Sequence, residues 1–186
     1  IRAQRSDRPA PDLSDQSWVQ RGSNGCCWEC RGPSGKYLIV TSAPLELVKR
    51  QSVLVADYPA GASFGPRELF DEEFIWLLRG SAIWTVQAGW REAGERILLR
   101  PGMLALSRLG TVDHLLWDPD SISTHAYAHF TVRNTERLGP RDTWPLVRDM
   151  TAAPVLGGLT TYLLELAKLP GEAAARRTDE LLMLLL

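Results

Sequence analysis

From Tyr37 to Val132 the sequence alternates short β-forming runs with turn signals, and this alternation restricts the fold more than any other feature. The turn signals include Pro59-Ala60-Gly61, Arg79-Gly80-Ser81 and Pro101-Gly102. About nine short strands with frequent turns and no helical pattern between them predict a mainly β fold, an antiparallel sandwich or barrel. The runs are Tyr37–Val40, Leu45–Val48, Ser52–Tyr58, Glu73–Leu78, Ala82–Val86, Arg96–Leu99, Met103–Ser107, His114–Trp117 and His125–Val132.

After Asn134 the pattern becomes helical. Pro154 is well placed as the first residue of a helix that ends before Pro170-Gly171, and a second helix is expected from about Glu172. In the first helix, leucines recur at spacings of three, four and three and form one stripe. The stripe predicts a dimerisation face or, as an equally open alternative, packing within the chain; it contains Leu156, Leu159, Leu163 and Leu166.

These patterns predict an organisation into three parts. Residues 1–35 are expected to form a partly irregular arm, residues 36–135 the barrel, and residues 136–186 a linker with the helical unit. The first residue is Ile1, not Met, and the chain stops inside the apolar run Leu181–Leu186. We therefore expect this sequence to be a piece of a longer protein.

Charge and hydropathy exclude several classes of function. The 21 Lys and Arg residues nearly balance the 22 Asp and Glu residues, which leaves a net charge of -1, so the chain by itself is expected to be a poor DNA binder. No window reaches the roughly 20 apolar residues that a membrane span needs, and the N-terminal residues do not resemble a signal peptide. We expect no membrane association and a cytoplasmic location.

Three motifs together resemble a known family. Glu73–Gly80 is similar to the end of the first cupin motif, Leu99–Leu104 with the following Gly110 and His114 is similar to the second, and Tyr127–Phe130 resembles the late strand of AraC-type sensors. With the leucine-rich helices, residues 37 to 186 resemble the N-terminal ligand-binding and dimerisation domain of AraC-type transcriptional regulators.

The resemblance implies a cupin-like antiparallel β-barrel (jelly roll) followed by a C-terminal pair of α-helices. It implies a small-molecule effector inside the barrel, a homodimer through the helices, no cofactor and no enzymatic activity. DNA would be bound only through a helix-turn-helix domain, which is expected C-terminal to residue 186.

One alternative is a metal-dependent small cupin enzyme, an isomerase or dioxygenase. Enzymatic cupins place two histidines a few residues before the glutamate of the first motif, and the corresponding segment Pro66–Asp71 contains none. Glu73 and His114 would be the remaining metal ligands, and two protein ligands rarely hold a catalytic metal.

The ligand-binding prediction rests on charged, aromatic and imidazole side chains in the barrel segment. Glu73 would be costly to bury without a partner such as Arg67, and indole rings supply stacking faces for sugars or aromatic effectors. His125 and His129 lie four residues apart in one strand and should face the same side. The predicted ligand-binding residues are Arg67, Glu73, Trp76, Trp84, His114 and His129.

A cysteine cluster supports a third hypothesis, a thiol-based or metal-responsive sensor. Cys27 and Cys30 have the spacing of many zinc and redox pairs, and Cys26 lies beside them. The sequence contains no second cysteine pair, and reduced cytosolic thiols commonly have no special role.

Overall fold

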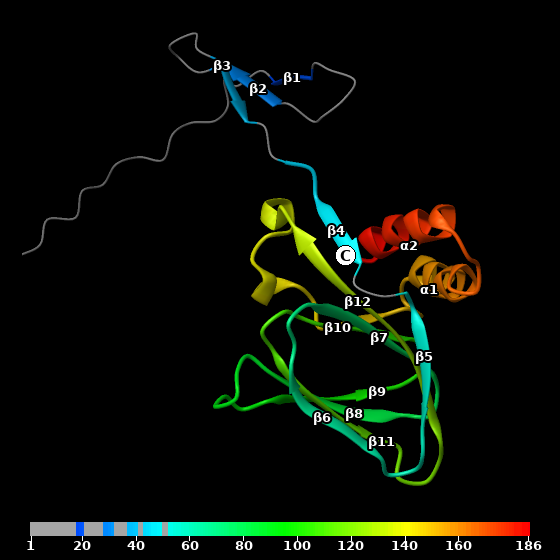
Figure 1. Cartoon of the computed structure of the whole chain (residues 1–186). Helices are drawn as coiled ribbons and strands as arrows, with labels where there is room; N and C mark the ends of the chain where they lie inside the picture. Colours follow the sequence, from blue (N-terminus) through cyan, green and yellow to red (C-terminus); the bar gives the residue numbers. More distant parts are fainter. Residues whose placement is uncertain (1–17, 21–27, 32–36, 41–42, 50–51) are drawn as a thin grey trace, which may run out of the picture. The chain divides into compact units, whose positions relative to one another are not determined.

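The computed structural model describes residues 18–20, 28–31, 37–40, 43–49 and 52–186, and the chain divides into the units Ile1–Pro44 and Leu45–Leu186. In the first unit, β1 (Trp18–Gln20), β2 (Trp28–Arg31) and β3 (Tyr37–Val40) form an antiparallel sheet in the order β1-β2-β3 (Figure 1). The expectation that Tyr37–Val40 is the first barrel strand is therefore wrong, because this segment pairs with β2.

The second unit contains two antiparallel sheets (Figure 1). The larger has the order β13-β10-β7-β12-β4, with β5 also paired to β12, and the smaller has the order β6-β11-β8-β9. The strands of the larger sheet are β4 (Glu46–Lys49), β5 (Leu54–Tyr58), β7 (Glu72–Arg79), β10 (Met103–Ser107), β12 (Ser123–Arg133) and β13 (Val147–Asp149). Those of the smaller are β6 (Ser63–Glu68), β8 (Ala82–Gln87), β9 (Glu95–Leu99) and β11 (Val112–Trp117).

The larger sheet is the middle layer of three. Side chains alternate between the two faces of a strand, and β12 shows this clearly: Ala126, Ala128 and Phe130 belong to a core shared with the helices, whereas His125 and Tyr127 lie on the opposite face. A second apolar core fills part of the space between the two sheets; its fully buried members include Ile75, Trp84, Leu99, Leu115 and Trp117. The larger sheet thus has one face toward the smaller sheet and one toward the helices.

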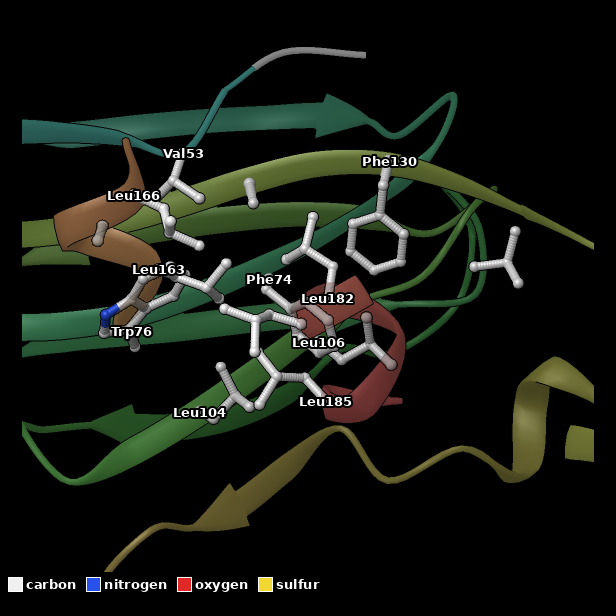
Figure 2. Packing of buried hydrophobic residues seen from close by; sticks show 14 of the residues in the cluster. Val53, Phe74, Trp76, Leu104, Leu106, Phe130, Leu163, Leu166, Leu182 and Leu185 are labelled. Atoms are coloured by element: carbon white, nitrogen blue, oxygen red, sulfur yellow. The ribbon is translucent and has the colours of Figure 1, made fainter. Parts of the chain in front are cut away.

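Two helices cover the outer face of the larger sheet (Figure 1): α1 (Pro154–Leu166) and α2 (Glu172–Leu185). They are preceded by the short 3-10 helices η1 (Thr135–Leu138) and η2 (Arg141–Thr143). Figure 2 shows leucines of both helices packed against the sheet; the labelled residues include Phe74, Trp76, Leu104, Leu106 and Phe130 from strands and Leu163, Leu166, Leu182 and Leu185 from helices. The predicted order of a mainly β sandwich followed by a helical pair is confirmed.

The leucine stripe of α1 is the face that packs within the chain. Leu163 is 0% exposed, Leu166 is buried beside it, and Leu156 and Leu159 are partly buried against the same core. The sequence left open whether this stripe meets the barrel or a second copy, and the structure assigns it to the barrel. Leu163 and Leu166 are buried by this packing, and dimerisation through the helices stays a prediction.

Polar contacts attach the C-terminal part to the sheet. The guanidinium of Arg148 on β13 donates to the carbonyl oxygens of Leu185 and Leu186, which satisfies carbonyl groups at the end of α2. Arg141 Nε donates to Oε1 of Glu72 at 2.8 Å, and the side chain of Glu72 is 0% exposed. A buried carboxylate requires such a partner.

Candidate functional site

A row of polar side chains crosses the larger sheet on its inner face. The strand register places Ser107 of β10 opposite Glu73 of β7, and Glu73 opposite His129 of β12. On the smaller sheet, Arg67 of β6 pairs with Asp113 of β11. The two sheets therefore bring these five polar residues toward one another from strands that are distant in the sequence.

Arg67 joins the two sheets electrostatically. Its Nε donates to Oδ1 of Asp113 at 3.0 Å, and its Nη2 forms an ion pair with Glu73. The Arg67 side chain is 24% exposed, whereas those of Glu73 and Asp113 are 3% and 1% exposed. Burial alone would lower the pKa of the guanidinium, but the charges of Glu73 and then Asp113 outweigh it and raise the pKa. Arg67 therefore stays charged.

Asp113 accepts further hydrogen bonds from within the core. Ser107 Oγ donates to its Oδ2 at 2.9 Å, and Trp84 Nε1 donates to the same oxygen at 3.4 Å. Hydrogen bonds to an ionised carboxylate compensate for the solvation it loses on burial.

His129 lies between two carboxylates. Its Nδ1 is 2.9 Å from Oδ1 of Asp71, and its Nε2 is 3.3 Å from Oε1 of Glu73. Burial acts to lower the pKa of this imidazole, but the hydrogen bond and charge of Glu73, followed by those of Asp71, raise the pKa above its ordinary value. The protonated ring can donate to both carboxylates.

The charges of this cluster do not cancel. Three carboxylates, Asp71, Glu73 and Asp113, surround one guanidinium and one imidazole. Even with His129 protonated, the ionised cluster carries one excess negative charge. We call these residues, with Ser107 and Trp84, the interior polar cluster.

An aromatic row extends from this cluster through the sandwich. Tyr127 meets His129 edge-on with ring centroids 5.9 Å apart, and it stacks on His125 at 5.1 Å. His125 in turn lies 4.8 Å from Trp117, which stacks on Tyr58 at 4.4 Å. Flat rings beside charged groups are the combination found in sites that bind small polar molecules.

Burial changes the ionisation of this row. His125 is 4% exposed, and burial, with the nearby charge of Arg67, lowers its pKa to about 4, so the ring is neutral at pH 7. Burial and then the neighbouring Tyr127 raise the pKa of Tyr58. His125 Nδ1 and Trp117 Nε1 are buried without a hydrogen-bond partner, which leaves polar atoms unsatisfied in the row.

Four of the six predicted ligand-binding residues meet in the interior polar cluster: Arg67, Glu73, Trp84 and His129. Trp76 does not join them, because it lies on the opposite face of β7 in the core shared with the helices (Figure 2). The prediction that Trp76 lines the same interior site as Trp84 is therefore wrong. His114 lies between Asp113 and Leu115, both of which point into the sandwich, so alternation turns it outward.

The predicted common face of His125 and His129 is confirmed, since both flank Tyr127. Sequence reasoning missed Asp71, Ser107 and Asp113 as members of the cluster. Asp113 precedes a predicted strand and Ser107 ends one, so only the cross-strand register reveals them. Sequence reasoning also missed three residues of the aromatic row, because only the pairing of the strands brings them together: Tyr58, Trp117 and Tyr127.

The hypothetical metal pair of Glu73 and His114 is not assembled, because Glu73 points inward and His114 outward. Over residues 43–49 and 52–186, no three His, Cys, Asp or Glu side chains are arranged to hold a metal ion. Cys26 and Cys27 lie outside the described residues, and so does the side chain of Cys30 in β2. The thiol hypothesis stays a prediction.

No helix in the described part of the chain has both the length and the apolar character needed to cross a membrane. No protein-family model matches the sequence, and no curated protein matches it.

Solved structures similar to this chain include cupins. The Drosophila melanogaster CENP-C cupin domain is 10% identical with a TM-score of 0.40, over 65% of this chain and 82% of that one. YhaK from Escherichia coli is 14% identical with a TM-score of 0.40, over 73% of this chain and 50% of that one. RmlC from Streptococcus suis, in complex with dTDP-D-xylose, is 10% identical with a TM-score of 0.36, over 61% of this chain and 69% of that one. The chain itself is a mainly β sandwich of antiparallel sheets followed by two C-terminal helices.

Proposed function

We propose that this chain is the effector-sensing and dimerisation domain of an AraC-type transcriptional regulator. It binds a small molecule inside the sandwich and controls a helix-turn-helix DNA-binding domain that follows residue 186. The observation that carries the proposal is the interior polar cluster, in which Arg67, Glu73 and His129 meet beside a row of aromatic rings.

The cluster favours a neutral, hydroxyl-rich effector such as a sugar over an aromatic acid. Its carboxylate oxygens can accept hydrogen bonds from hydroxyl groups, and the aromatic ring of Tyr127 lies beside the cluster, a combination that suits a sugar. The excess negative charge repels an acid. Arg67 and His129 are 24% and 16% exposed at the side chain, so solvent reaches the cluster through them.

The arrangement supports binding rather than catalysis. Arg67, Glu73, Asp113 and His129 each already have a charged or hydrogen-bonding partner. An effector can exchange hydrogen bonds with such groups without any chemical step. An effector that replaces some of these hydrogen-bond partners would bind one arrangement of the domain more tightly than another. Such a difference in affinity is what a regulatory ligand needs.

Strand β7 links the cluster to the helices. Glu73 points to the interior, and the next residue, Phe74, lies in the core that contains Leu163 of α1 and Leu182 of α2. An effector that shifts β7 therefore acts on the packing of the helical pair. We infer a population shift between two arrangements of helices and sheet as the signal.

The homodimer of this proposal uses the outward face of α1. Val155 is 67% exposed and Tyr162, two turns later, is 44% exposed, with the exposed Gly158 between them. These residues lie away from the leucine stripe that packs on the sheet. A second copy that packs there would bury both side chains.

A reporter fusion tests the function. The chain, joined to a DNA-binding domain that represses only as a dimer, is expected to repress in a manner that depends on a neutral sugar supplied from a panel of monosaccharides. Glu73→Gln should remove the sugar response and Tyr162→Asp should remove repression. Glu68→Gln, an exposed neighbour on β6, is the matched control. Repression that no sugar alters, or that Tyr162→Asp leaves intact, would overturn the proposal.

A further inference from the structure

His129 bridges two carboxylates that come from different segments. Its Nδ1 lies 2.9 Å from Oδ1 of Asp71, just before β7, and its Nε2 lies 3.3 Å from Oε1 of Glu73, on β7. An imidazole donates from both nitrogens only when it is protonated, because the neutral ring has one N–H and one lone pair. Both contacts are therefore hydrogen bonds at the same time only in the charged form of His129.

Loss of the proton changes the contact with Glu73. The contact of Nδ1 with Asp71 is the shorter of the two, so the hydrogen of the neutral ring stays on Nδ1. The lone pair of Nε2 then faces Oε1 of Glu73, which gives two acceptors 3.3 Å apart with no hydrogen between them. Glu73 keeps its ion pair with Arg67 through its other oxygen. Partly buried acceptors without a donor cost free energy, so the neutral cluster has a place for groups that donate.

Two neighbouring hydroxyl groups of a sugar supply the donors that this pair of acceptors needs. Each hydroxyl donates one hydrogen bond, so one can donate to Nε2 of His129 and the other to Oε1 of Glu73. Solvent reaches the pair through the partly exposed side chains of His129 and Arg67. The protonated ring offers no such place, because its Nε2–H already occupies Oε1 of Glu73.

Titratable and charged groups of both sheets surround His129. In the part of the chain that the structure describes, they are Asp71 before β7, Glu73 on β7, Arg67 on β6, Asp113 on β11, Tyr58 on β5, and His125 and Tyr127 on β12. Burial, and then the charge of Arg67, lowers the pKa of His125 to about 4, whereas burial and then Tyr127 raise the pKa of Tyr58. Neither group changes charge between pH 6 and pH 8. Burial acts to lower the pKa of His129, but Glu73 and then Asp71 raise it above 6.5, so this ring is protonated at pH 6.

We propose that the interior polar cluster binds two neighbouring hydroxyl groups of a sugar in exchange for the proton of His129. The inference rests on the proposed effector function and adds its regulation, since acid and effector compete for one site. The proton leaves Nε2 for the solvent, and the hydroxyl groups replace its hydrogen bond to Glu73. Because the sugar binds the neutral ring, its affinity falls as the pH drops below the pKa of His129, approaching about tenfold per pH unit.

Calorimetric titration of the whole chain with D-xylose, D-ribose, D-galactose and D-mannose tests this exchange. We expect at least one of these sugars to bind, and to bind more weakly at pH 6 than at pH 8. Titrations at pH 6.5 in phosphate and in Bis-Tris, two buffers with different enthalpies of ionisation, count the protons, and we expect release of up to one proton per bound sugar. In the complex, nitrogen NMR of the His129 ring should show Nε2 as the nitrogen without a hydrogen.

Two histidines give a matched pair of variants. His129→Gln cannot be protonated and should lose the dependence of affinity on pH between 6 and 8. His114→Gln changes a histidine that β11 turns outward and should keep it. The wild type provides a measurement that does not need either variant to fold, because a saturating sugar should lower the pKa of His129 in an NMR titration of the ring.

The outcomes separate this inference from the proposed function. A sugar that binds equally well at pH 6 and pH 8, or that leaves the pKa of His129 unchanged, overturns the exchange and leaves the effector site in place. If none of the four sugars binds at either pH, both proposals are overturned.

Discussion

Nε2 of His129 lies 3.3 Å from Oε1 of Glu73, so an imidazole on β12 and a carboxylate on β7 meet as cross-strand neighbours inside the sandwich. Together with the ion pair to Arg67, this contact compensates for the solvation that the Glu73 carboxylate loses at 3% exposure. The imidazole also links Glu73 to Asp71, so protonation of one ring affects two carboxylates. Titration of the His129 imidazole therefore reports on the whole interior polar cluster.

His129 should stabilise the fold most at acidic pH. Its pKa in the folded protein is raised above the ordinary value of 6.5 by Glu73 and Asp71. The stabilisation is fully present below the unfolded-state value and is lost as the pH rises through the folded-state value. NMR titration of the His129 ring should give a midpoint above 6.5, and the stability advantage of the wild type over His129→Gln should shrink with rising pH. A midpoint below 6.5 contradicts this.

His125 should show the opposite behaviour. Burial and the charge of Arg67 lower its pKa from 6.5 to about 4, which corresponds to about 3 kcal/mol at most. The neutral ring favours folding above pH 6.5, and this contribution is lost as the pH falls toward 4. His125→Phe keeps a ring in the aromatic row but has no group to protonate. The free energy of unfolding of this variant, measured with urea, should therefore rise relative to that of the wild type as the pH falls from 7 to 4. Parallel pH curves for the two proteins would rule the prediction out.

Arg141 should contribute to stability through Glu72. Arg141→Met leaves the fully buried carboxylate of Glu72 without its charged partner and should lower the free energy of unfolding by about 1–3 kcal/mol. Arg177→Met breaks an exposed pair with Glu180 on α2 and should have no measurable effect. Chemical denaturation of both variants measures the difference. An equal loss in the free energy of unfolding for the two variants would show that the buried ion pair with Glu72 stabilises the fold no more than the exposed one does.

The two faces of α1 should respond differently to substitution. Leu163 is 0% exposed, so Leu163→Ala should destabilise the chain by about 2–5 kcal/mol. Tyr162→Asp, one residue earlier, should leave the fold intact and convert the proposed dimer to a monomer. Thermal unfolding and analytical ultracentrifugation separate the two effects. A folded Leu163→Ala monomer would indicate that the leucine stripe, not the outward face, forms the dimer.

Much of the fold was predictable because turn residues and β-forming runs mark most strands directly. β6 was missed because Gly65-Pro66 interrupts it; proline is tolerated there since β6 is an edge strand of its sheet. β13 was missed because it has only three residues. Both omissions concern edge strands, where the local sequence signal is weakest.

The faces of the strands were less predictable than their positions. Residues Glu72 to Leu77 of β7 are all buried, because helices cover one face of the sheet and the second sheet covers the other. Hydrophobic alternation then cannot tell which face is interior, and Trp76 was assigned to the wrong one. Near His114 the pairing of β11 with β6 shifts between Asp113 and Leu115, an irregularity that the sequence does not reveal.

Calorimetric titration of neutral monosaccharides into the wild type, Glu73→Gln and Glu68→Gln tests the central claim most directly. We predict one-site binding of at least one sugar to the wild type, unchanged in Glu68→Gln. Binding to Glu73→Gln should be at least about tenfold weaker, which corresponds to about 1.4 kcal/mol. The claim is contradicted if no sugar binds the wild type, or if Glu73→Gln binds as tightly as the wild type.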